Sequence, residues 1–268
     1  MSIPAEILNR KGARKVSEIP PEVLQLLNTG KIETANLMEW LAVDQLNLVQ
    51  RVLAQENTES WLPQFEEILA SEKKPTANTH AKLIGLEFGK LGAGSPILES
   101  LQSHESDVVR CWACWAFSLQ YEQVQTLLPA MKRFAADRHF GVREVVIFAV
   151  KEKLIQDLDK AVEILANWTS SEDENVRRFV AETLRPVGVW VKKVAEFQQH
   201  PQKGLALIEP LKADPSKYVQ NAVANWLNDA SKSQPGWVKE VCTRWTKESD
   251  SKATKYIVKR GLRTVNKG

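Results

Sequence analysis

The sequence predicts an all-α fold, a solenoid of stacked helical pairs, and two observations carry this prediction. The first is a short phrase that recurs, at intervals of 33, 34 and then 43 residues, at the start of an apolar run with helical spacing. A period of this size is typical of helical-repeat solenoids, in which one helix pair alone cannot bury its apolar face. The four copies of the phrase are Asp107-Val108-Val109-Arg110, Phe140-Gly141-Val142-Arg143, Glu174-Asn175-Val176-Arg177 and Lys217-Tyr218-Val219-Gln220.

Composition is the second observation. The 268 residues include only 12 glycines, are rich in Leu, Ala, Glu, Lys and Gln, and show little of the alternation typical of strands. The net charge is only +3, with basic residues gathered in the first 20 and last 14 positions. Such ends fit a surface that follows a polyanion, and they fit solvated tails equally well.

Cysteine usage and hydropathy indicate the compartment. The chain has three cysteines, an odd number, and no signal peptide, which favours a reducing cytoplasm. No apolar run approaches 18 residues, so no membrane span is expected. Cys111 and Cys114 form a CxxC within an apolar helical run, and the chain has only four histidines. We interpret the pair as buried thiols and expect no metal.

The individual elements follow from breaks in the helical pattern. Residues 1–20 look loosely structured and end in Ile19-Pro20-Pro21, where the second proline suits a helix start. We divide the chain into a basic N-terminal segment with a helical cap, residues 1–95, and a repeat region, residues 96–268, within one continuous solenoid domain. Helices are expected near 21–28, 33–42, 44–54, 58–71 and 77–93, and helical pairs at 96–121, 124–155, 158–185, 202–234 and 236–263.

Two segments place polar residues in patterns that a packing role alone does not require. In the first, Arg178, Glu182 and Arg185 follow one another at helical spacings of four and three residues, so they share one face. The simplest interpretation of this group is an intrahelical salt bridge on a wet surface.

The second segment places Tyr218, Asn221, Asn225 and Asp229 along one stripe of a helix. Asparagine is a poor helix former, so three asparagines within eight residues of this helix require a reason beyond helix propensity. Polar stripes on the inner helices of solenoids usually line a ligand groove, and we expect such a groove here.

These two segments resemble motifs of the HEAT-like-repeat DNA alkylation repair family (AlkC/AlkD type), and they are closer to its AlkC branch. That branch carries V-R-R-x-x-S-E-G-T-R-P followed shortly by P-W, where this chain reads V-R-R-F-V-A-E-T-L-R-P and then V-W over 176–190. The branch also carries Y-V-R-R-S-V-A-N-x-L-N-D followed by K-x-x-P, where this chain reads Y-V-Q-N-A-V-A-N-W-L-N-D and then K-S-Q-P over 218–235. The resemblance spans 96–263 and implies a right-handed α-solenoid of HEAT-like repeats.

The resemblance also implies an activity. Proteins of this family grip duplex DNA on a concave surface and excise cationic N-alkylpurines such as 3-methyladenine by hydrolysing the N-glycosidic bond, without metal or cofactor. A cationic purine is already a good leaving group, so the enzyme has to stabilise oxocarbenium charge on the deoxyribose, for which carboxylates and an indole face are suited. Carried over by position, the catalytic residues are Glu182, Asp229 and Trp190, and the DNA-binding residues are Arg143, Arg177, Arg178, Arg185, Tyr218, Asn221 and Asn225.

The repeat spacing adds a geometric expectation. Glu182 and Asp229 are 47 residues apart, one repeat plus an insertion, which predicts that consecutive inner helices bring them close together. We expect two unpaired acids on the floor of the groove with Trp190 at the intervening turn, and Arg143 and Arg177 on the same concave side.

Three positions depart from the family pattern. His139 stands where the AlkC branch has a third pocket carboxylate, and Gln220-Asn221 stands where it has two arginines. We interpret His139, beside Phe140, as a structural loop histidine rather than a proton-transfer group. The alternative function, from another class, is a non-catalytic scaffold that binds branched or damaged DNA or a partner protein. We expect the protein to be a monomer.

Overall fold

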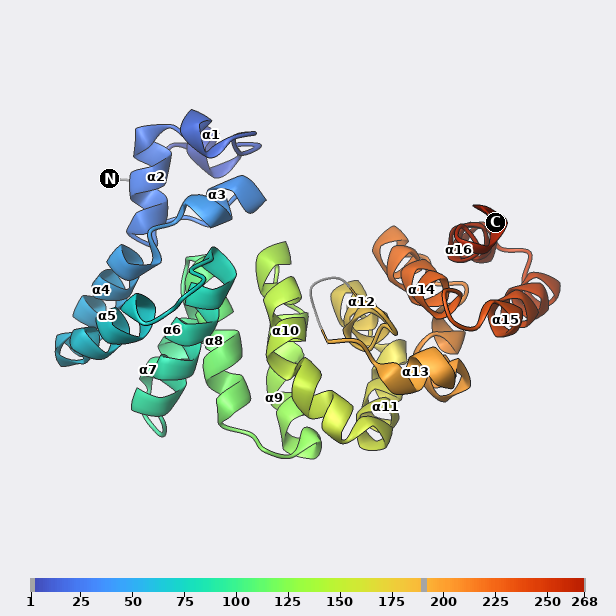
Figure 1. Cartoon of the computed structure of the whole chain (residues 1–268). Coiled ribbons are helices and arrows are strands. Elements are labelled where there is room, and N and C mark those ends of the chain that lie inside the picture. The colour runs from blue at the N-terminus through green and yellow to red at the C-terminus, as the bar shows by residue number, and fades with distance from the viewer. Residues whose placement is uncertain (1–2, 189–191, 268) are drawn as a thin grey trace. The chain divides into compact units, whose positions relative to one another are not determined.

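The protein is all-helical wherever its structure is described. The computed structural model describes residues 3–188 and 192–267, and these residues contain helices and connecting turns but no strand (Figure 1). The predicted fold class, an all-α solenoid of HEAT-like repeats, is confirmed. Antiparallel pairs follow one another along the chain, as in α7 with α8 and α15 with α16.

The chain forms two compact units. Unit 1 comprises the chain up to Tyr121 together with Arg138–Val146, and unit 2 comprises Glu122–Asp137 together with the chain from Ile147 onward. The predicted division near residue 96 falls inside unit 1, and it stays a prediction about repeat organisation.

Unit 1 contains the N-terminal helices and the first copies of the repeat phrase. Residues 3–20 are less loose than predicted for this segment, because Arg10 forms a 2.6 Å ion pair with the buried Glu39. The helices are α1 (Ala5–Leu8), α2 (Pro21–Asn28), α3 (Leu37–Ala42), α4 (Gln45–Gln55), α5 (Leu62–Ala70), α6 (Ala77–Leu91), α7 (Ile97–Ser103), α8 (Asp107–Leu119) and the first turns of α10 (Phe140–Gln156), with short 3-10 helices η1 (Val16–Glu18) and η2 (Glu59–Trp61).

Helices α6 and α8 form the core of unit 1, and glycines set their spacing. A Cβ at Gly85 would collide with the backbone carbonyl oxygen of Trp112, so the two helices approach more closely than a larger residue allows. Trp112 is fully buried and donates its indole N–H to the amide oxygen of Gln45 at 3.0 Å. Cys111 and Cys114 are buried free thiols, as predicted.

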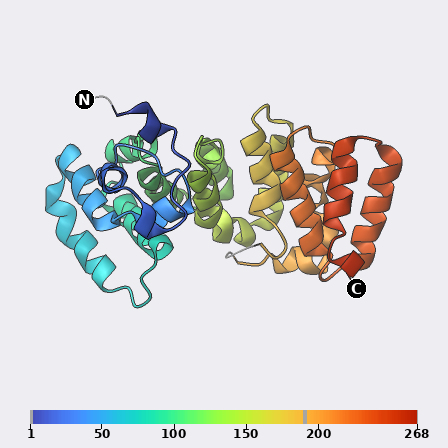
Figure 2. The same cartoon turned by 90° about the horizontal axis from the view of Figure 1, so that it is seen from above.

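Unit 2 contains the later repeats. Helices α12, α14 and α16 lie side by side, with α14 in the middle (Figure 2). The helices are α9 (Val124–Ala135), the rest of α10, α11 (Leu158–Ala166), α12 (Glu174–Thr183), α13 (Ala195–Gln199), α14 (Lys217–Ala230), α15 (Pro235–Glu248) and α16 (Lys252–Gly261), with 3-10 helices η3 (Asn167–Ser170), η4 (Pro201–Leu207), η5 (Glu209–Leu211) and η6 (Val265–Lys267).

The helical pair predicted at 202–234 differs from expectation in its first member, which is made of the 3-10 helices η4 and η5. Pro201 and Pro210 lack the N–H that a continuous α-helix needs. Gly204 also lies against the buried Trp226, where an added Cβ would be 2.5 Å from a ring carbon. This segment therefore packs irregularly against the apolar face of α14, with Gly204 against Trp226.

The recurring phrase has a structural reason. Its last residue reaches back from the first turn of the helix and donates to backbone carbonyls five or six positions earlier, in the loop between the two helices of the pair. These carbonyls have no partner within a helix, so they need other hydrogen-bond donors. The bonds are Arg110 to His104 and Glu105 (2.8 and 3.0 Å), Arg143 to Arg138 (2.8 Å), Arg177 to Ser171 and Glu172 (2.8 and 2.9 Å), and Gln220 to Asp214 and Pro215 (2.9 and 3.4 Å).

This loop brace predicts the effect of two substitutions at one position. Arg177→Ala removes both carbonyl bonds and leaves Asp214, which pairs with Arg177 at 2.7 Å, without that partner, so we expect a loss of about 2 kcal/mol of unfolding free energy. Arg177→Gln should cost less than half as much, because Gln220 makes the same brace without a charge. Urea denaturation of the two variants measures the difference, and equal losses would contradict the brace.

Candidate active site and nucleic-acid interface

The candidate site lies in unit 2, where α12 and α14 end beside each other. Glu182 is in the last turn of α12, and Asp229 is in the last turn of α14. Arg185, just beyond α12, joins them, with Nη1 at 2.5 Å from Glu182 Oε1 and Nε at 2.9 Å from Asp229 Oδ2. The predicted proximity of the two carboxylates is confirmed within unit 2.

The chain leaves α12 in a way that makes this contact possible. Pro186 has no N–H to continue the helix, and Gly188 adopts a left-handed φ of +65°, which glycine accepts without strain. The Gly188 N–H then donates to Asp229 Oδ2 at 3.1 Å. The exit segment 184–188 is thereby fixed against the end of α14.

The two acids are not unpaired, contrary to the expectation from sequence. Asp229 is only 2% exposed and also accepts from Lys232 Nζ at 2.9 Å, while the Glu182 side chain is 15% exposed. Burial by itself lowers the pKa of Arg185, but Glu182 and Asp229 outweigh it and raise that pKa above its ordinary value. The intrahelical ion pair considered from sequence does form between Glu182 and Arg185, in a mostly buried place rather than on a wet surface.

Arg185, which the sequence predicted to contact a DNA phosphate, is therefore already paired within the protein. It is 7% exposed and its guanidinium is occupied by the two carboxylates. Arg177, predicted in the same role, is occupied by Asp214 and by its two loop carbonyls. Arg143 braces the carbonyl of Arg138 and lies in unit 1, whereas the other predicted residues within the described chain lie in unit 2. The repeat arginines Arg143 and Arg177 thus stabilise the fold through these contacts.

Arg178 and Tyr218 form the next part of the site. The Arg178 guanidinium carbon lies 5.0 Å from the centroid of the Tyr218 ring, a distance at which cation and ring attract. Arg178 is 6% exposed and Tyr218 is half-buried. The pair connects the first half of α12 to the first turn of α14.

The asparagines of α14 connect it to α16 and to the residues that follow α16. Asn221 Oδ1 accepts from the Tyr256 hydroxyl at 2.7 Å, and Asn225 Oδ1 accepts from Arg263 Nη2 at 3.0 Å. One turn later, Asn228 Oδ1 accepts from the N–H and the hydroxyl of Thr264. This row of bonds supplies the reason, missing from the sequence argument, for three asparagines in one helix.

Cations surround Tyr256. Lys217 Nζ lies over its ring at 2.6 Å from the centroid, and the Arg260 guanidinium carbon lies at 5.5 Å from the same centroid. Both cations are exposed at the surface. Sequence reasoning missed this cluster, although Tyr256 and Arg260 are four residues apart, which places them on one side of α16, and Arg263 follows just beyond the end of the helix.

Lys151 was also missed, and it lies beneath the site. Its side chain comes from the buried face of α10, between Ile147 and Leu154, and is only 2% exposed. Its Nζ donates to the backbone carbonyl of Thr183 at 2.6 Å. Burial, helped by the nearby charge of Arg185, lowers the pKa of Lys151 to about 7. The available signal was a single cation placed at core spacing within an apolar helical run.

Trp190, the third predicted catalytic residue, lies outside the described residues. The described part of the chain contains no group of three His, Cys, Asp or Glu side chains placed to hold a metal ion. Among the described helices, none combines the length and apolar character that crossing a membrane requires.

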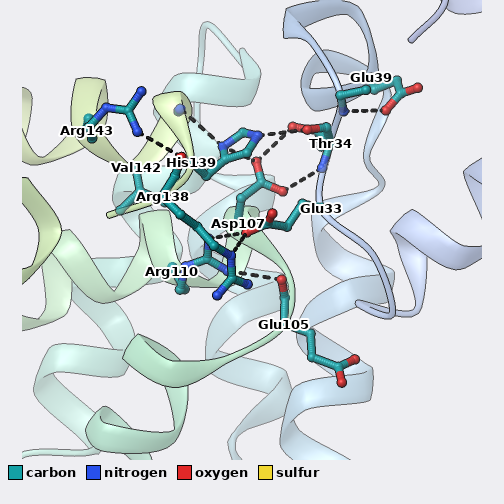
Figure 3. Close-up of polar contacts among 12 residues, drawn as sticks. Glu33, Thr34, Glu39, Glu105, Asp107, Arg110, Arg138, His139, Val142 and Arg143 are labelled. Atoms are coloured by element: carbon teal, nitrogen blue, oxygen red, sulfur yellow. Dashed lines mark hydrogen bonds and ion pairs between the residues drawn. The ribbon is translucent and has the colours of Figure 1, made fainter. Parts of the chain in front are cut away.

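His139 belongs to a buried network in unit 1 (Figure 3). Its Nε2 lies 2.7 Å from the carbonyl oxygen of Thr34 and its Nδ1 lies 3.1 Å from Asp107 Oδ2. Asp107 also accepts from the N–H and the hydroxyl of Thr34, each at 2.8 Å, and burial raises the pKa of its carboxyl against these contacts. Both ring nitrogens of His139 thus have partners inside the protein, a position that fits its interpretation as a structural loop histidine.

The ion-paired site predicts a non-additive effect on stability. Arg185→Met leaves Asp229 and Glu182 buried without their common partner, and should lower the unfolding free energy by about 3 kcal/mol. The double variant Arg185→Met/Asp229→Asn should be less destabilised than the sum of the single variants, because it removes one of the stranded charges. Denaturant unfolding of the four proteins gives the coupling energy, and strictly additive losses would show that the pair contributes nothing.

Comparison with protein families gives a match over residues 144–260, to the model described as DNA alkylation repair enzyme. Over 120 residues the chain is 35% identical to the uncharacterized protein YhaZ of Bacillus subtilis (strain 168). That alignment covers 45% of this chain and 33% of YhaZ, so the chain spans about a third of the length of this relative.

Solved structures show the same fold. The alkylpurine DNA glycosylase AlkC of Pseudomonas fluorescens, bound to DNA containing an abasic site analog, superposes with a TM-score of 0.69 at 21% identity, covering 96% of this chain and 66% of AlkC. AlkD2 from Streptococcus mutans gives 0.59 at 23% identity, covering 76% and 97%. The protein smu.31 from Streptococcus mutans UA159 gives 0.51 at 26% identity, covering 79% and 96%. Over residues 144–260 the chain thus resembles the DNA alkylation repair family, in line with the resemblance of its motifs, and it shares the fold of AlkC and AlkD2.

Proposed function

We propose that this protein binds duplex DNA and releases cationic N-alkylpurines such as 3-methyladenine by hydrolysing the N-glycosidic bond, as a DNA glycosylase that acts as a monomer in the cytoplasm. The observation that carries the proposal is the meeting of Glu182 and Asp229 at the ends of α12 and α14. The family match over 144–260 and the fold shared with the alkylpurine glycosylase AlkC support it.

Both carboxylates lie where a cation is favoured for a second reason. The C-terminal end of an α-helix carries a partial negative charge, because its last carbonyls lack partners in the helix. Two such ends, α12 and α14, meet here, and each adds a carboxylate in its last turn. The arrangement is suited to a substrate whose positive charge moves from the purine to the sugar as the bond breaks.

The two acids have different parts in this proposal. Glu182 is the more accessible, and we assign it the contact with the deoxyribose and the attacking water. Asp229 is buried, fixes Arg185 and the Gly188 N–H, and adds negative charge at short range. Trp190 keeps its proposed role as an aromatic face for the cation, on the resemblance alone. The reaction as proposed needs no metal or cofactor.

For DNA binding we propose the surface of α12, α14 and α16, which we call the α14 face and define by Arg178, Tyr218, Asn221, Asn225, Lys217, Tyr256, Arg260 and Arg263. Lys217 and Arg260 are the exposed cations of this surface, and contacts of this kind to phosphates position DNA without reading its sequence. Arg143 and Arg177 are assigned mainly structural roles.

One observation favours the second candidate, a DNA-binding scaffold without catalysis. Asp229 has three partners, Arg185, Lys232 and Gly188, which is an arrangement that a purely structural carboxylate would also have. The two candidates make opposite predictions about release of the base.

If the protein is a glycosylase, variants of its two acids should release the base more slowly without binding DNA more weakly. We expect Asp229→Asn to lower the single-turnover release of 3-methyladenine by roughly 100-fold, with Glu182→Gln giving a similar loss, since each removes one negative charge that stabilises the sugar cation. Affinity for alkylated DNA should stay equal or become tighter. Chromatography of released bases measures the rate, and binding without release by the unmodified protein would leave the scaffold as the function.

The α14 face predicts a salt-dependent loss of affinity. Lys217→Ala/Arg260→Ala should weaken binding to all duplex sequences and reduce the slope of log affinity against log salt by about one unit for each phosphate that the variant no longer neutralises. The matched control is Lys239→Ala/Lys247→Ala, which removes two exposed cations from α15, the other helix of the last pair. Fluorescence anisotropy over a salt series compares them, and an equal effect of both pairs would mean that this face is not the interface.

A further inference from the structure

The end of α12 lacks the usual means of satisfying its last carbonyls. In a continuing helix these oxygens accept from N–H groups three or four positions later, but Pro186 has none. The cap residue Leu184 and the next residue, Arg185, both direct their N–H groups to the carbonyl of Glu182. Among the described residues, the carbonyls of Thr183 and Arg185 therefore need a donor from another element.

Lys151 provides that donor from α10. Its Nζ lies 2.6 Å from the carbonyl oxygen of Thr183 and 3.4 Å from that of Arg185, one on each side of the turn. On the other side of the exit segment, Asp229 accepts from the Gly188 N–H and from the Arg185 side chain. The segment that carries Arg185 is thus held from both sides, by Lys151 through its carbonyls and by Asp229 through its donors.

We propose that Lys151 is a positioning residue for the glycosylase reaction, holding the end of α12 so that Glu182 and Arg185 face Asp229, and doing so as a neutral amine in the active protein. The inference rests on the proposed function for its catalytic consequence only. The holding role itself follows from the two carbonyl contacts and the burial of the side chain.

Neutrality matters because of the charges that face the amine. These are Glu182 and Arg185 at the end of α12 and Asp229 on α14, with Lys232 and Arg263 close to Asp229. A neutral Lys151 leaves the charge of this group unchanged, whereas a protonated Lys151 adds an excess positive charge to it. Such an excess opposes a transition state that carries a positive sugar, so protonation of Lys151 should slow base release.

The test compares the wild type with Lys151→Met, Lys151→Arg and, as a control, Lys239→Met on the exposed surface of α15. Single-turnover release of 3-methyladenine is measured over a pH range from about 5.5 to about 9, which brackets the titration. We expect the wild-type and control rates to rise about tenfold through a step near pH 7 and then level off, since the folded pKa of Lys151 is about 7. Lys151→Arg stays cationic, and should remain about tenfold slower than wild type above the step. Lys151→Met should lack the step.

Two measurements keep the inference testable if no base is released. Hydrogen exchange at the Gly188 amide should become faster in Lys151→Met, because the exit segment is then held from one side only. The unfolding free energy of the wild type relative to Lys151→Met should rise as pH increases from about 7 toward 10.5, since over that range the unfolded lysine holds a proton that the folded one lacks.

The outcomes separate the two ideas. A wild type that releases no base overturns the proposed function, while the Gly188 exchange and the pH-dependent stability still decide the role of Lys151. A pH step that persists in Lys151→Met overturns the neutral-amine inference, even if base release is rapid. Unchanged exchange at Gly188 in that variant overturns the holding role.

Discussion

Arg185 sits between two carboxylates that come from different repeats, and the arrangement of unit 2 around the site depends on this contact. A guanidinium that is 7% exposed is tolerated only if its charge is matched and its N–H groups are bonded, and Glu182 and Asp229 do both. Each of the neighbouring features serves the same contact. Pro186 ends α12, Gly188 turns the chain, and Lys151 donates a hydrogen bond to the Thr183 carbonyl at this turn. The geometry of the site is therefore determined by the way in which α12 ends, and not by an additional loop.

The repeat phrase shows how a solenoid can use arginine without using it for ligand binding. A helix pair has to return the chain through a tight loop, and the carbonyls of that loop have no partners in either helix. In each of these repeats, a long side chain from the next helix donates hydrogen bonds to the loop carbonyls. Gln220 shows that the length and the donors matter more than the charge, since it makes the same bonds as Arg177. Thr254, at the corresponding place in the last pair, departs from the pattern, because its hydroxyl donates to the carbonyl of Lys212 in the preceding repeat.

Periodicity made the repeat architecture and the meeting of Glu182 with Asp229 predictable, because both depend on spacing along the chain. The partners of those acids were not predictable, since the direction of Arg185 depends on how the chain leaves α12 after Pro186. The asparagines illustrate the same limit. Their stripe was visible, but its use depends on Tyr256 and Arg263, which lie 35 and 38 residues further along the chain than the asparagines they bond. Lys151 was missed for another reason, because a lysine among apolar residues is usually solvated, and the burial of this one depends on a turn 32 residues away.

The pairing of the interior arginines has a consequence for how quickly a polyanion would find this protein. Arg110, Arg177 and Arg185 each have a carboxylate within hydrogen-bonding distance, so at long range each pair acts as a weak dipole rather than as a charge. Lys217 and Arg260 lie instead over the neutral ring of Tyr256, where their charges are not cancelled by that contact. The field that reaches into solvent from this part of unit 2 thus originates largely from a few surface groups. The rate of encounter, and its fall with ionic strength, should follow those groups and not the total number of arginines in the sequence.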